Sequence, residues 1–368
     1  MTEIAIQLSA SALGLAGPGD APLRLFNPSL APDGAGFVLA FRVIGAAGER
    51  HIGLCRLDSG LAVVPGSPRL LSPALRMPSG MASDWFADPR LTLSSGRLFL
   101  HWNTGWQVPG NQQFVVELDP VSLQPVAQAR ALRLVTGQQP IEKNWTFFGE
   151  GLSHAVYAPD PHRLVCLAEE TADALIYEEV IRHAWPDTPF QRRYGALRGG
   201  ATPVLKNGQY TSIGHCVVRT ALGVRYVAAA YRFAAQWPFA LMALPTTILP
   251  LARPTGAGLM QAGFNPATEH VVYPTGAQDR GNDWIVPMAS MMPNAALQRS
   301  LKRTLRRPCG PSCLNAKHHS CRPDSGPSHR RRRRGRAHAA SRTSAGRARR
   351  CGGWRWGPGP AACGSPCR

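Results

Sequence analysis

The segment WFADPRL, residues 85–91, places an aspartate and an arginine at the start of an apolar run. Asp88 and Arg90 are two positions apart, so on an extended strand both side chains point to the same face. A carboxylate beside a guanidinium has its charged form stabilised. In a pocket, such a carboxyl group can donate a proton or bind the hydroxyls of a sugar. The alternative is a structural Asp–Arg pair that locks neighbouring elements together.

A similar arrangement occurs earlier in the chain. FNPSL, which contains Asn27, precedes an alternating apolar run in the same way that ADPRL, which contains Asp88, precedes the next one. Asn27 and Asp88 are 61 positions apart. The same 61 positions separate two further pairs of equivalent residues, Phe37 from Leu98 and Asp58 from Asp119. Three features that match at one offset indicate an internal repeat.

The unit recurs with looser spacing at NWTFF, GGATPV and YPTGA, which are residues 144–148, 199–204 and 273–277. Each unit has a turn with Pro or Gly followed by alternating β-branched and aromatic residues, which predicts strands. Residues 171–184 fit either a helix or the outer strands of the third unit. Such units bury both faces by stacking around an axis. The sequence therefore predicts an all-β, five-bladed β-propeller; a β-sandwich or two barrels is the alternative.

In a propeller the first strand of each blade lines the central channel, so polar residues at the blade starts converge. This predicts a pocket at one end of the channel. The residues expected to line it are Asn27, Asp88, Arg90, Lys143, Asn144, Arg198 and the residues after Trp284.

The order of FNPSL, ADPRL, EKNWTFF, YAPDPHRL, LRGGATPV and YPTGA resembles the five-bladed propeller glycosidase-like proteins. These are related to phosphorylases and hydrolases of β-mannosides and to mannosyltransferases. The resemblance extends over roughly residues 22–288. It implies that Asp88 is the general acid of an inverting reaction on an oligosaccharide or glycoconjugate. Phosphate or water would then attack from the opposite face.

A bound phosphate needs cationic donors. Lys143, Arg198 and His162 are the candidates, as a point charge, a planar fork and a switchable donor. The candidates for sugar binding are Trp145 by stacking and Asn27 and Asn144 by hydrogen bonds. Each has a structural alternative: Lys143 can be a solvated loop residue, His162 can cap a turn, and Trp145 can belong to the core.

The sequence departs from the family in lacking an obvious Arg-rich phosphate cluster in the second blade. The second carboxylate of an inverting hydrolase is not assigned either, although Asp84 and Asp160 are possible. Phosphorolysis, hydrolysis and glycosyl transfer therefore stay open, as does a non-catalytic sugar-binding propeller. No metal and no cofactor is expected, apart from inorganic phosphate as a co-substrate.

The charge of the chain is concentrated at one end. The chain has 41 Lys plus Arg against 22 Asp plus Glu, but 19 of the basic residues and only one acid, Asp324, lie in residues 299–368. The body is nearly neutral, so the overall charge is no evidence that the body binds nucleic acid. Only three scattered cysteines lie in the body, and no apolar run is long enough to cross a membrane. These features predict a cytoplasmic protein without a membrane span.

The resemblance leads us to expect a Gly-Ile-Asn-Asp-like motif after the fifth-blade turn. Residues 289–295 instead read ASMMPNA, which deletion of one base from codons for Gly-Ile-Asn-Asp-Ala-Glu-Cys would produce. We therefore predict two parts: a propeller over residues 1–288 with an incomplete last blade, and a frameshifted, disordered basic tail over residues 289–368. The alternative is a functional arm that binds nucleic acid non-specifically through HRRRRRGR at 329–336.

Overall fold

The computed structural model describes residues 4–17, 23–78, 85–105, 111–221, 223–251, 268–281, 283–289 and 295–301. All of them belong to one compact unit that spans residues 1–321. Within these ranges the secondary structure is almost entirely β. The described part of the chain has one α-helix, α1 (Pro189–Tyr194), and no helix that is long and apolar enough to cross a membrane.

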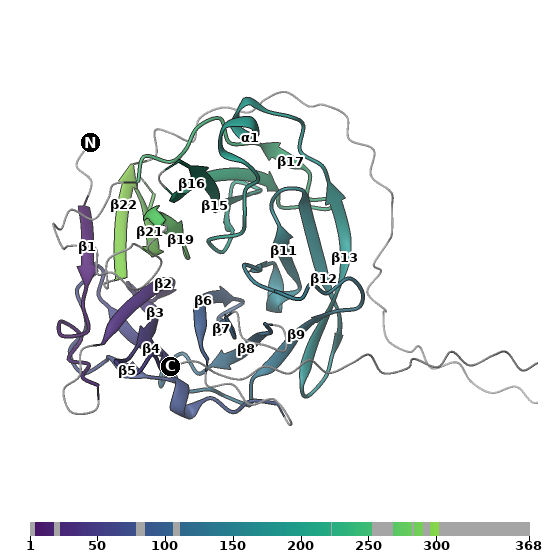
Figure 1. The fold of residues 1–368 in the computed structure, drawn as a ribbon. Helices are drawn as coiled ribbons and strands as arrows, with labels where there is room; N and C mark the ends of the chain where they lie inside the picture. Colours follow the sequence, from purple (N-terminus) through teal and green to yellow (C-terminus); the bar gives the residue numbers. More distant parts are fainter. Residues whose placement is uncertain are drawn as a thin grey trace, which may run out of the picture. The chain divides into compact units, whose positions relative to one another are not determined.

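The strands form four hydrogen-bonded sheets (Figure 1). The first sheet contains β2 (Arg24–Asp33), β3 (Gly36–Ile44), β4 (Arg50–Leu57) and β5 (Arg69–Leu70). The second has eight strands: β6 (Ala87–Ser94), β7 (Arg97–Asn103), β8 (Gln113–Leu118), β9 (Arg130–Leu134), β10 (Thr146–Phe148), β11 (His154–Ala158), β12 (His162–Glu170) and β13 (Ala174–His183).

The third sheet contains β14 (Val204–Lys206), β15 (Gln209–Thr220), β16 (Gly223–Ala234), β17 (Leu241–Ala243) and β18 (Thr268–His270). The last contains β1 (Ile4–Leu8), β19 (Tyr273–Pro274), β20 (Gln278–Asp279), β21 (Asp283–Ala289) and β22 (Ala295–Leu301). The eight-stranded sheet consists of two antiparallel units, β6 to β9 and β10 to β13, joined by a parallel pairing of β9 with β13. With the two halves of this sheet counted separately, the described strands form five groups, which we call units; neighbouring strands within them are antiparallel except β16 and β18.

The units are arranged around a common centre, as Figure 1 shows. The first strands of successive units meet there: β2 contacts β6, and β6 contacts β10. The prediction of an all-β propeller is confirmed. The starts of these inner strands lie near the common centre, as predicted for residues that line a central pocket. Of residues 171–184, which fitted a helix or outer strands, Ala174–His183 form the strand β13.

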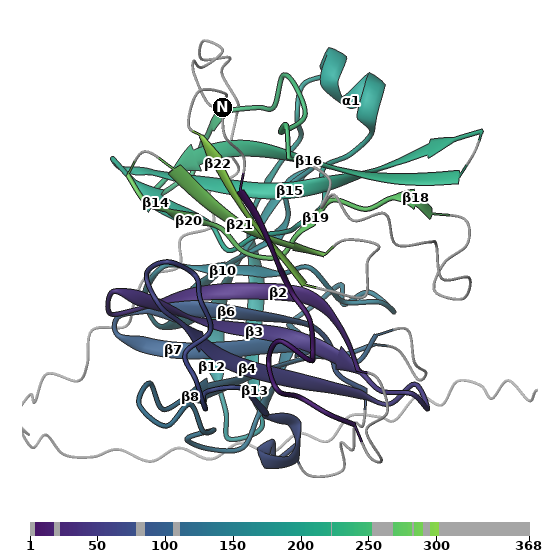
Figure 2. The same ribbon diagram turned by 90° about the vertical axis from the view of Figure 1, so that its left-hand side faces the viewer.

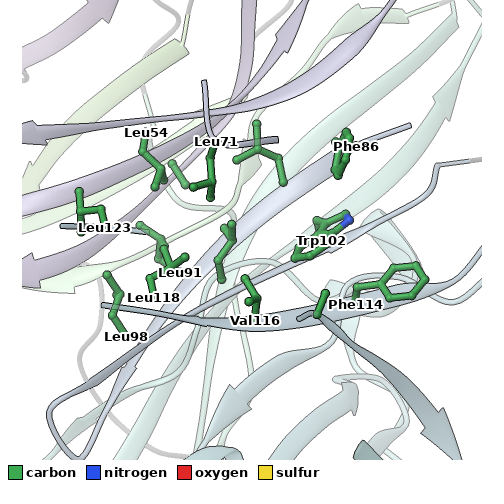
Figure 3. Packing of buried hydrophobic residues seen from close by; sticks show 14 of the residues in the cluster. Leu54, Leu71, Phe86, Leu91, Leu98, Trp102, Phe114, Val116, Leu118 and Leu123 are labelled. Atoms are coloured by element: carbon green, nitrogen blue, oxygen red, sulfur yellow. The ribbon is translucent and has the colours of Figure 1, made fainter. Parts of the chain in front are cut away.

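Successive side chains of a strand such as β7 point alternately to the two neighbouring units, because each unit is buried on both faces. On β7, Leu98, Leu100 and Trp102 belong to the core shared with the first unit. Figure 3 shows this cluster, in which Leu54 and Leu71 of the first unit lie close to Leu91 and Leu98 of the second. The intervening Phe99 packs instead with residues of the third unit. The alternation of apolar residues that the sequence predicts, with a period of two, therefore matches the alternation of side chains between the two neighbouring units.

The last unit includes a strand beyond the predicted boundary at residue 288, β22 (Ala295–Leu301). β22 pairs with β21 along Asp283–Met288 and with β1 along Ile4–Leu8, so β1 forms the outer edge of this sheet (Figure 1 and Figure 2). Ladder hydrogen bonds use main-chain groups, which almost any extended segment can offer, so residues 295–301 can pair in this way whatever their side chains. β22 lies within the predicted tail. Residues 290–294, residues 302–368 and the basic run at 329–336 lie outside the described residues.

Candidate functional site

Three repeats begin with a residue whose backbone is in the left-handed conformation, with a positive φ. Asn27 and Asp88 both have a φ of 49°, and Asn144 has a φ of 67°. The pairing register shifts at the first two positions, between Phe26 and Ser29 and between Ala87 and Arg90. Such bulges re-aim a side chain, and Asn and Asp adopt this conformation more readily than other non-glycine residues. The repeat therefore places three polar side chains at equivalent positions of neighbouring units.

Asp88 is held by two amides and one guanidinium. Its Oδ1 accepts a hydrogen bond from Asn27 Nδ2, and its Oδ2 accepts one from Asn103 Nδ2 at 3.3 Å. Arg42 Nη1 lies 3.7 Å from Oδ1, and the Asp88 side chain keeps 18% of its surface exposed. Both carboxylate oxygens are thus anchored from the first and second units, while the group stays accessible.

Arg90 forms a second, buried cluster. Its Nη2 donates to Asn144 Oδ1 at 3.1 Å and to the Tyr273 hydroxyl at 2.6 Å, and that hydroxyl donates to Asn144 Oδ1 at 2.6 Å. Arg90 is only 1% exposed. The cluster joins the second, third and last units. We refer to Asn27, Arg42, Asp88, Arg90, Asn144 and Tyr273 together as the hub.

The predicted pairing of Arg90 with Asp88 needs correction. The hydrogen bonds of Arg90 go to Asn144 and Tyr273, whereas the ion pair of Asp88 is with Arg42. Strict alternation predicted a shared face, but the bulge between Ala87 and Arg90 interrupts that alternation.

Positive charge exceeds negative charge around Asp88. Burial lowers the pKa of Arg42, although the Asp88 carboxylate acts in the opposite direction. Burial and then repulsion by Arg42 lower the pKa of Arg50 to about 10. Burial also lowers the pKa of Lys143, with Asp88 opposing the shift and Arg198 adding to it. Three cations therefore interact with one carboxylate, an arrangement that favours an anionic ligand.

Two buried histidines flank the hub as neutral groups. Burial, followed by repulsion from Arg90, lowers the pKa of His101 to about 3, and its Nε2 lies 3.1 Å from the carbonyl oxygen of Trp145. Burial and then the charge of Arg90 also lower the pKa of His215, whose ring packs edge-on against Tyr273 with centroids 4.5 Å apart. Because both imidazole rings are neutral, they add no further positive charge to that of the neighbouring cations.

Glycine allows close backbone packing beside the hub, against the third unit at Gly199 and within the fourth unit at Gly200. A Cβ on Gly199 would lie 2.1 Å from the carbonyl oxygen of Asn144, and one on Gly200 would lie 2.5 Å from that of Ile213. Both distances are far below van der Waals contact. The GGATPV motif is thus explained by backbone packing beside the hub.

The structure brings Asn27, Asp88, Arg90 and Asn144 together, with Lys143 electrostatically coupled to Asp88. Arg198 has an exposed side chain, its backbone pairs with that of His215, and its charge acts on Lys143.

Two predicted site residues lie elsewhere. Trp145 is 1% exposed, packs edge-on against Tyr157 and Tyr177, and belongs to the core. His162 is 0% exposed and packs against Tyr231 and Phe233. Neither side chain has the exposed surface that contact with a sugar or a phosphate requires. Asp160 accepts a hydrogen bond from Gln191 of α1, and Asp84 lies outside the described residues.

Sequence reasoning missed Arg42, Asn103 and Tyr273. The first two are equivalent residues, because each follows its left-handed partner, Asn27 or Asp88, by 15 positions. Both bind Asp88 from the ends of second strands. The repeat offset of 61 positions relates Arg42 to Asn103 and could have identified them. Tyr273 carries no such signal, since the last repeat has looser spacing.

Within the described ranges, no group of three or more His, Cys, Asp or Glu side chains is arranged to hold a metal ion.

No family model matches the sequence, and no curated protein matches it. Solved structures do share the fold. A β-1,2-mannobiose phosphorylase from Listeria innocua, in complex with β-1,2-mannobiose, is similar with a TM-score of 0.54 and 14% identity, over 81% of this chain and 96% of that one. A glycosyl hydrolase from Bacteroides ovatus gives a TM-score of 0.50 and 12% identity, over 78% of this chain and 86% of that one. The chain therefore has the propeller fold found among glycosidases and glycoside phosphorylases.

Proposed function

We propose that the protein is a carbohydrate-active enzyme that acts on a β-mannosidic glycan by an inverting mechanism, with Asp88 as its general acid. The proposal depends above all on the environment of Asp88. This partly exposed carboxyl group is held by two amides among three cations where the units meet. The fold shared with glycosidases and glycoside phosphorylases supports the same reading.

The proposed reaction uses Asp88 to protonate the leaving oxygen, directly or through a hydroxyl of the sugar. The bond between that oxygen and the anomeric carbon breaks as a nucleophile attacks from the opposite face, so the configuration inverts. Each oxygen of Asp88 accepts one amide hydrogen bond and has a second lone pair. A proton on that second lone pair would be the one transferred.

Inorganic phosphate is the nucleophile that the charge favours. Arg42, Arg50 and Lys143 all interact with Asp88, so the site carries more positive than negative charge. Cationic groups stabilise a phosphate through charge-assisted hydrogen bonds. A glycosyltransferase reaction that uses a sugar phosphate as donor is the same chemistry in reverse and would use the same cations.

The test is turnover of β-1,2-mannobiose by wild type and Asp88→Asn, with and without inorganic phosphate. We expect wild type to form mannose and mannose 1-phosphate only when phosphate is present. Asp88→Asn should lose at least about 10²-fold in kcat, because the acid can no longer supply a proton.

Each other outcome has a definite meaning. Release of mannose without phosphate would identify a hydrolase, and the phosphate assignment would be wrong. Unchanged turnover by Asp88→Asn would remove Asp88 from the mechanism. Binding of glycans without turnover of any β-mannoside would identify a sugar-binding propeller in place of an enzyme.

A further inference from the structure

A continuous chain of hydrogen bonds leads from Asp88 into the third unit. Asn103 Nδ2 donates to Asp88 Oδ2, and Asn111 Nδ2 donates to Asn103 Oδ1 at 3.4 Å. Asn111 Oδ1 in turn accepts from the backbone N–H of Glu142 at 2.5 Å. Asn103 and Asn111 are each 3% exposed. The chain thus runs through buried amides to the residue that precedes Lys143 and Asn144.

The direction of every bond in this chain is fixed. A backbone N–H can only donate, so the N–H of Glu142 requires the oxygen of Asn111, and the amide nitrogen of Asn111 must face Asn103. The backbone N–H of Gly105 also donates to Asn103 Oδ1, at 2.8 Å. Asn103 is thereby left with only its N–H group to present to Asp88.

The far end of the chain is anchored by the Glu142 side chain. Glu142 is 2% exposed, and its Oε1 accepts from the Gln139 backbone N–H at 2.6 Å and from the Tyr157 hydroxyl at 3.0 Å. Its Oε2 accepts from Trp145 Nε1 at 3.0 Å. Three donors on two oxygens is the pattern that a carboxylate satisfies. The segment 139–145 is therefore held at both ends by one side chain.

We propose that Asn103, Asn111 and Glu142 form a positioning network that sets the Asp88 carboxylate relative to Lys143 and Asn144. This inference rests on the proposed function, in which Asp88 supplies the proton and Lys143 helps to hold phosphate. None of the three network residues needs to touch the substrate. They fix the distance between groups contributed by two different units.

The network matters because the hub is assembled from separate units. Asp88 belongs to the second unit and Asn144 to the third, and Asn144 bonds Arg90 and Tyr273 in turn. A small shift between two units would misalign the acid and the anion site, and a displacement of about 1 Å can cost about 10²-fold in rate. Buried amides with fixed donors and acceptors resist such a shift, because a displaced group would lose its partner.

The decisive variant is Asn111→Asp. A carboxylate at this position can still accept a hydrogen bond from the Glu142 N–H but cannot donate one to Asn103. The substitution therefore breaks only the link between position 111 and Asn103, which leads on to Asp88. Asn111→Ala loses both hydrogen bonds, the one to Asn103 and the one from the Glu142 N–H. Asn207→Asp is the matched control, because Asn207 is exposed in the turn between β14 and β15 and lies outside the network.

The readouts are kcat, KM for inorganic phosphate in the phosphorolysis of β-1,2-mannobiose, and backbone hydrogen exchange in residues 139–145. For Asn111→Asp we expect about a tenfold lower kcat, with KM for phosphate and the exchange rates unchanged. For Asn111→Ala, exchange should become faster and KM for phosphate should rise as well. A wild-type kcat in Asn111→Asp, or wild-type exchange in Asn111→Ala, would overturn the proposal.

Failure of the proposed function would be visible separately. If the wild type converts no β-mannoside, kcat and KM cannot be compared, and hydrogen exchange alone tests whether the network exists. Asn103→Ala must then speed up exchange in residues 139–145, although Asn103 belongs to another unit. If its effect is confined to the residues around position 103, no network exists.

Discussion

The side-chain amide of Asn27 donates a hydrogen bond to the carboxylate of Asp88, and these two residues begin successive repeats of the fold. They are 61 positions apart and share a φ of 49°. A duplicated local conformation has thus acquired two roles. The first repeat contributes the amide that donates the hydrogen bond, and the second contributes the carboxylate that accepts it.

The left-handed conformation at Asn27 predicts an unusual order of stability. Asn27→Gly and Asn27→Ala both lose the hydrogen bond to Asp88, but only Gly adopts a positive φ without strain. We expect Asn27→Ala to unfold with a free energy about 1 kcal/mol lower than that of Asn27→Gly. Urea titration of both variants measures the difference. Equal stability, or a more stable Ala variant, would show that position 27 is not held in this conformation.

Close packing at Gly199 predicts a local defect that reaches the hub. The Cβ of Gly199→Ala would lie 2.1 Å from the carbonyl oxygen of Asn144, so the backbone of one of the two units must move. We expect a loss of about 1–3 kcal/mol in the free energy of unfolding and a strong loss of glycoside turnover. Gly60→Ala is the control, since its nearest neighbour would be a side-chain oxygen of Asp58 at 3.3 Å. Similar effects of the two substitutions would argue against the mechanism.

The buried His101 makes stability depend on pH. Its folded pKa of about 3 lies below the value of about 6.5 expected in the unfolded chain, so the unfolded state binds more protons between these values. Stability from this group is complete above pH 6.5 and falls by about 1.4 kcal/mol per pH unit as the pH drops toward 3.

The test is the free energy of unfolding of His101→Gln at pH 7, 6, 5 and 4. Glutamine can still donate to the Trp145 carbonyl but does not titrate, so the slope should be shallower than that of wild type by about one proton. His215 and His162 keep their own contributions in this variant. Parallel slopes for the two proteins would mean that His101 does not titrate on unfolding.

The pairing of β22 predicts where the chain can be shortened. A truncation after Leu301 keeps all described strands, whereas one after Ala289 removes β22 and leaves the edges of both β21 and β1 unpaired. We expect the longer variant to keep the melting temperature of the full chain. The shorter one should melt lower and aggregate, because unpaired edges invite pairing with other chains. Equal melting temperatures for the two truncations would contradict the assignment of β22.

The sequence predicted those parts of the site that the repeat controls. Asn27, Asp88 and Asn144 were identified because each begins a unit, and the structure places all three in the hub. The ion-pair partner of Asp88 was mistaken, because a strand pattern does not reveal the bulge that turns Asp88 away from the face of Arg90.

The remaining errors concern burial. Trp145 was a candidate for stacking on a sugar and His162 for binding phosphate, but aromatic neighbours from other strands enclose both side chains. Such enclosure depends on contacts between units far apart in sequence, which local patterns do not encode. The contribution of Tyr273 was missed for the same reason, since it joins Arg90 across 183 positions of the chain.

The pairing of β1 with β22 has a consequence for synthesis on the ribosome. Ile4–Leu8 leaves the exit tunnel long before its hydrogen-bonding partner, Ala295–Leu301, which lies near the end of the described chain. At about 5–20 residues per second, the amino-terminal strand waits many seconds before it can pair. Intermediate chain lengths lack β22 and leave the edges of β1 and β21 unpaired, so this sheet is completed by a late event that joins a strand made early to a strand made late.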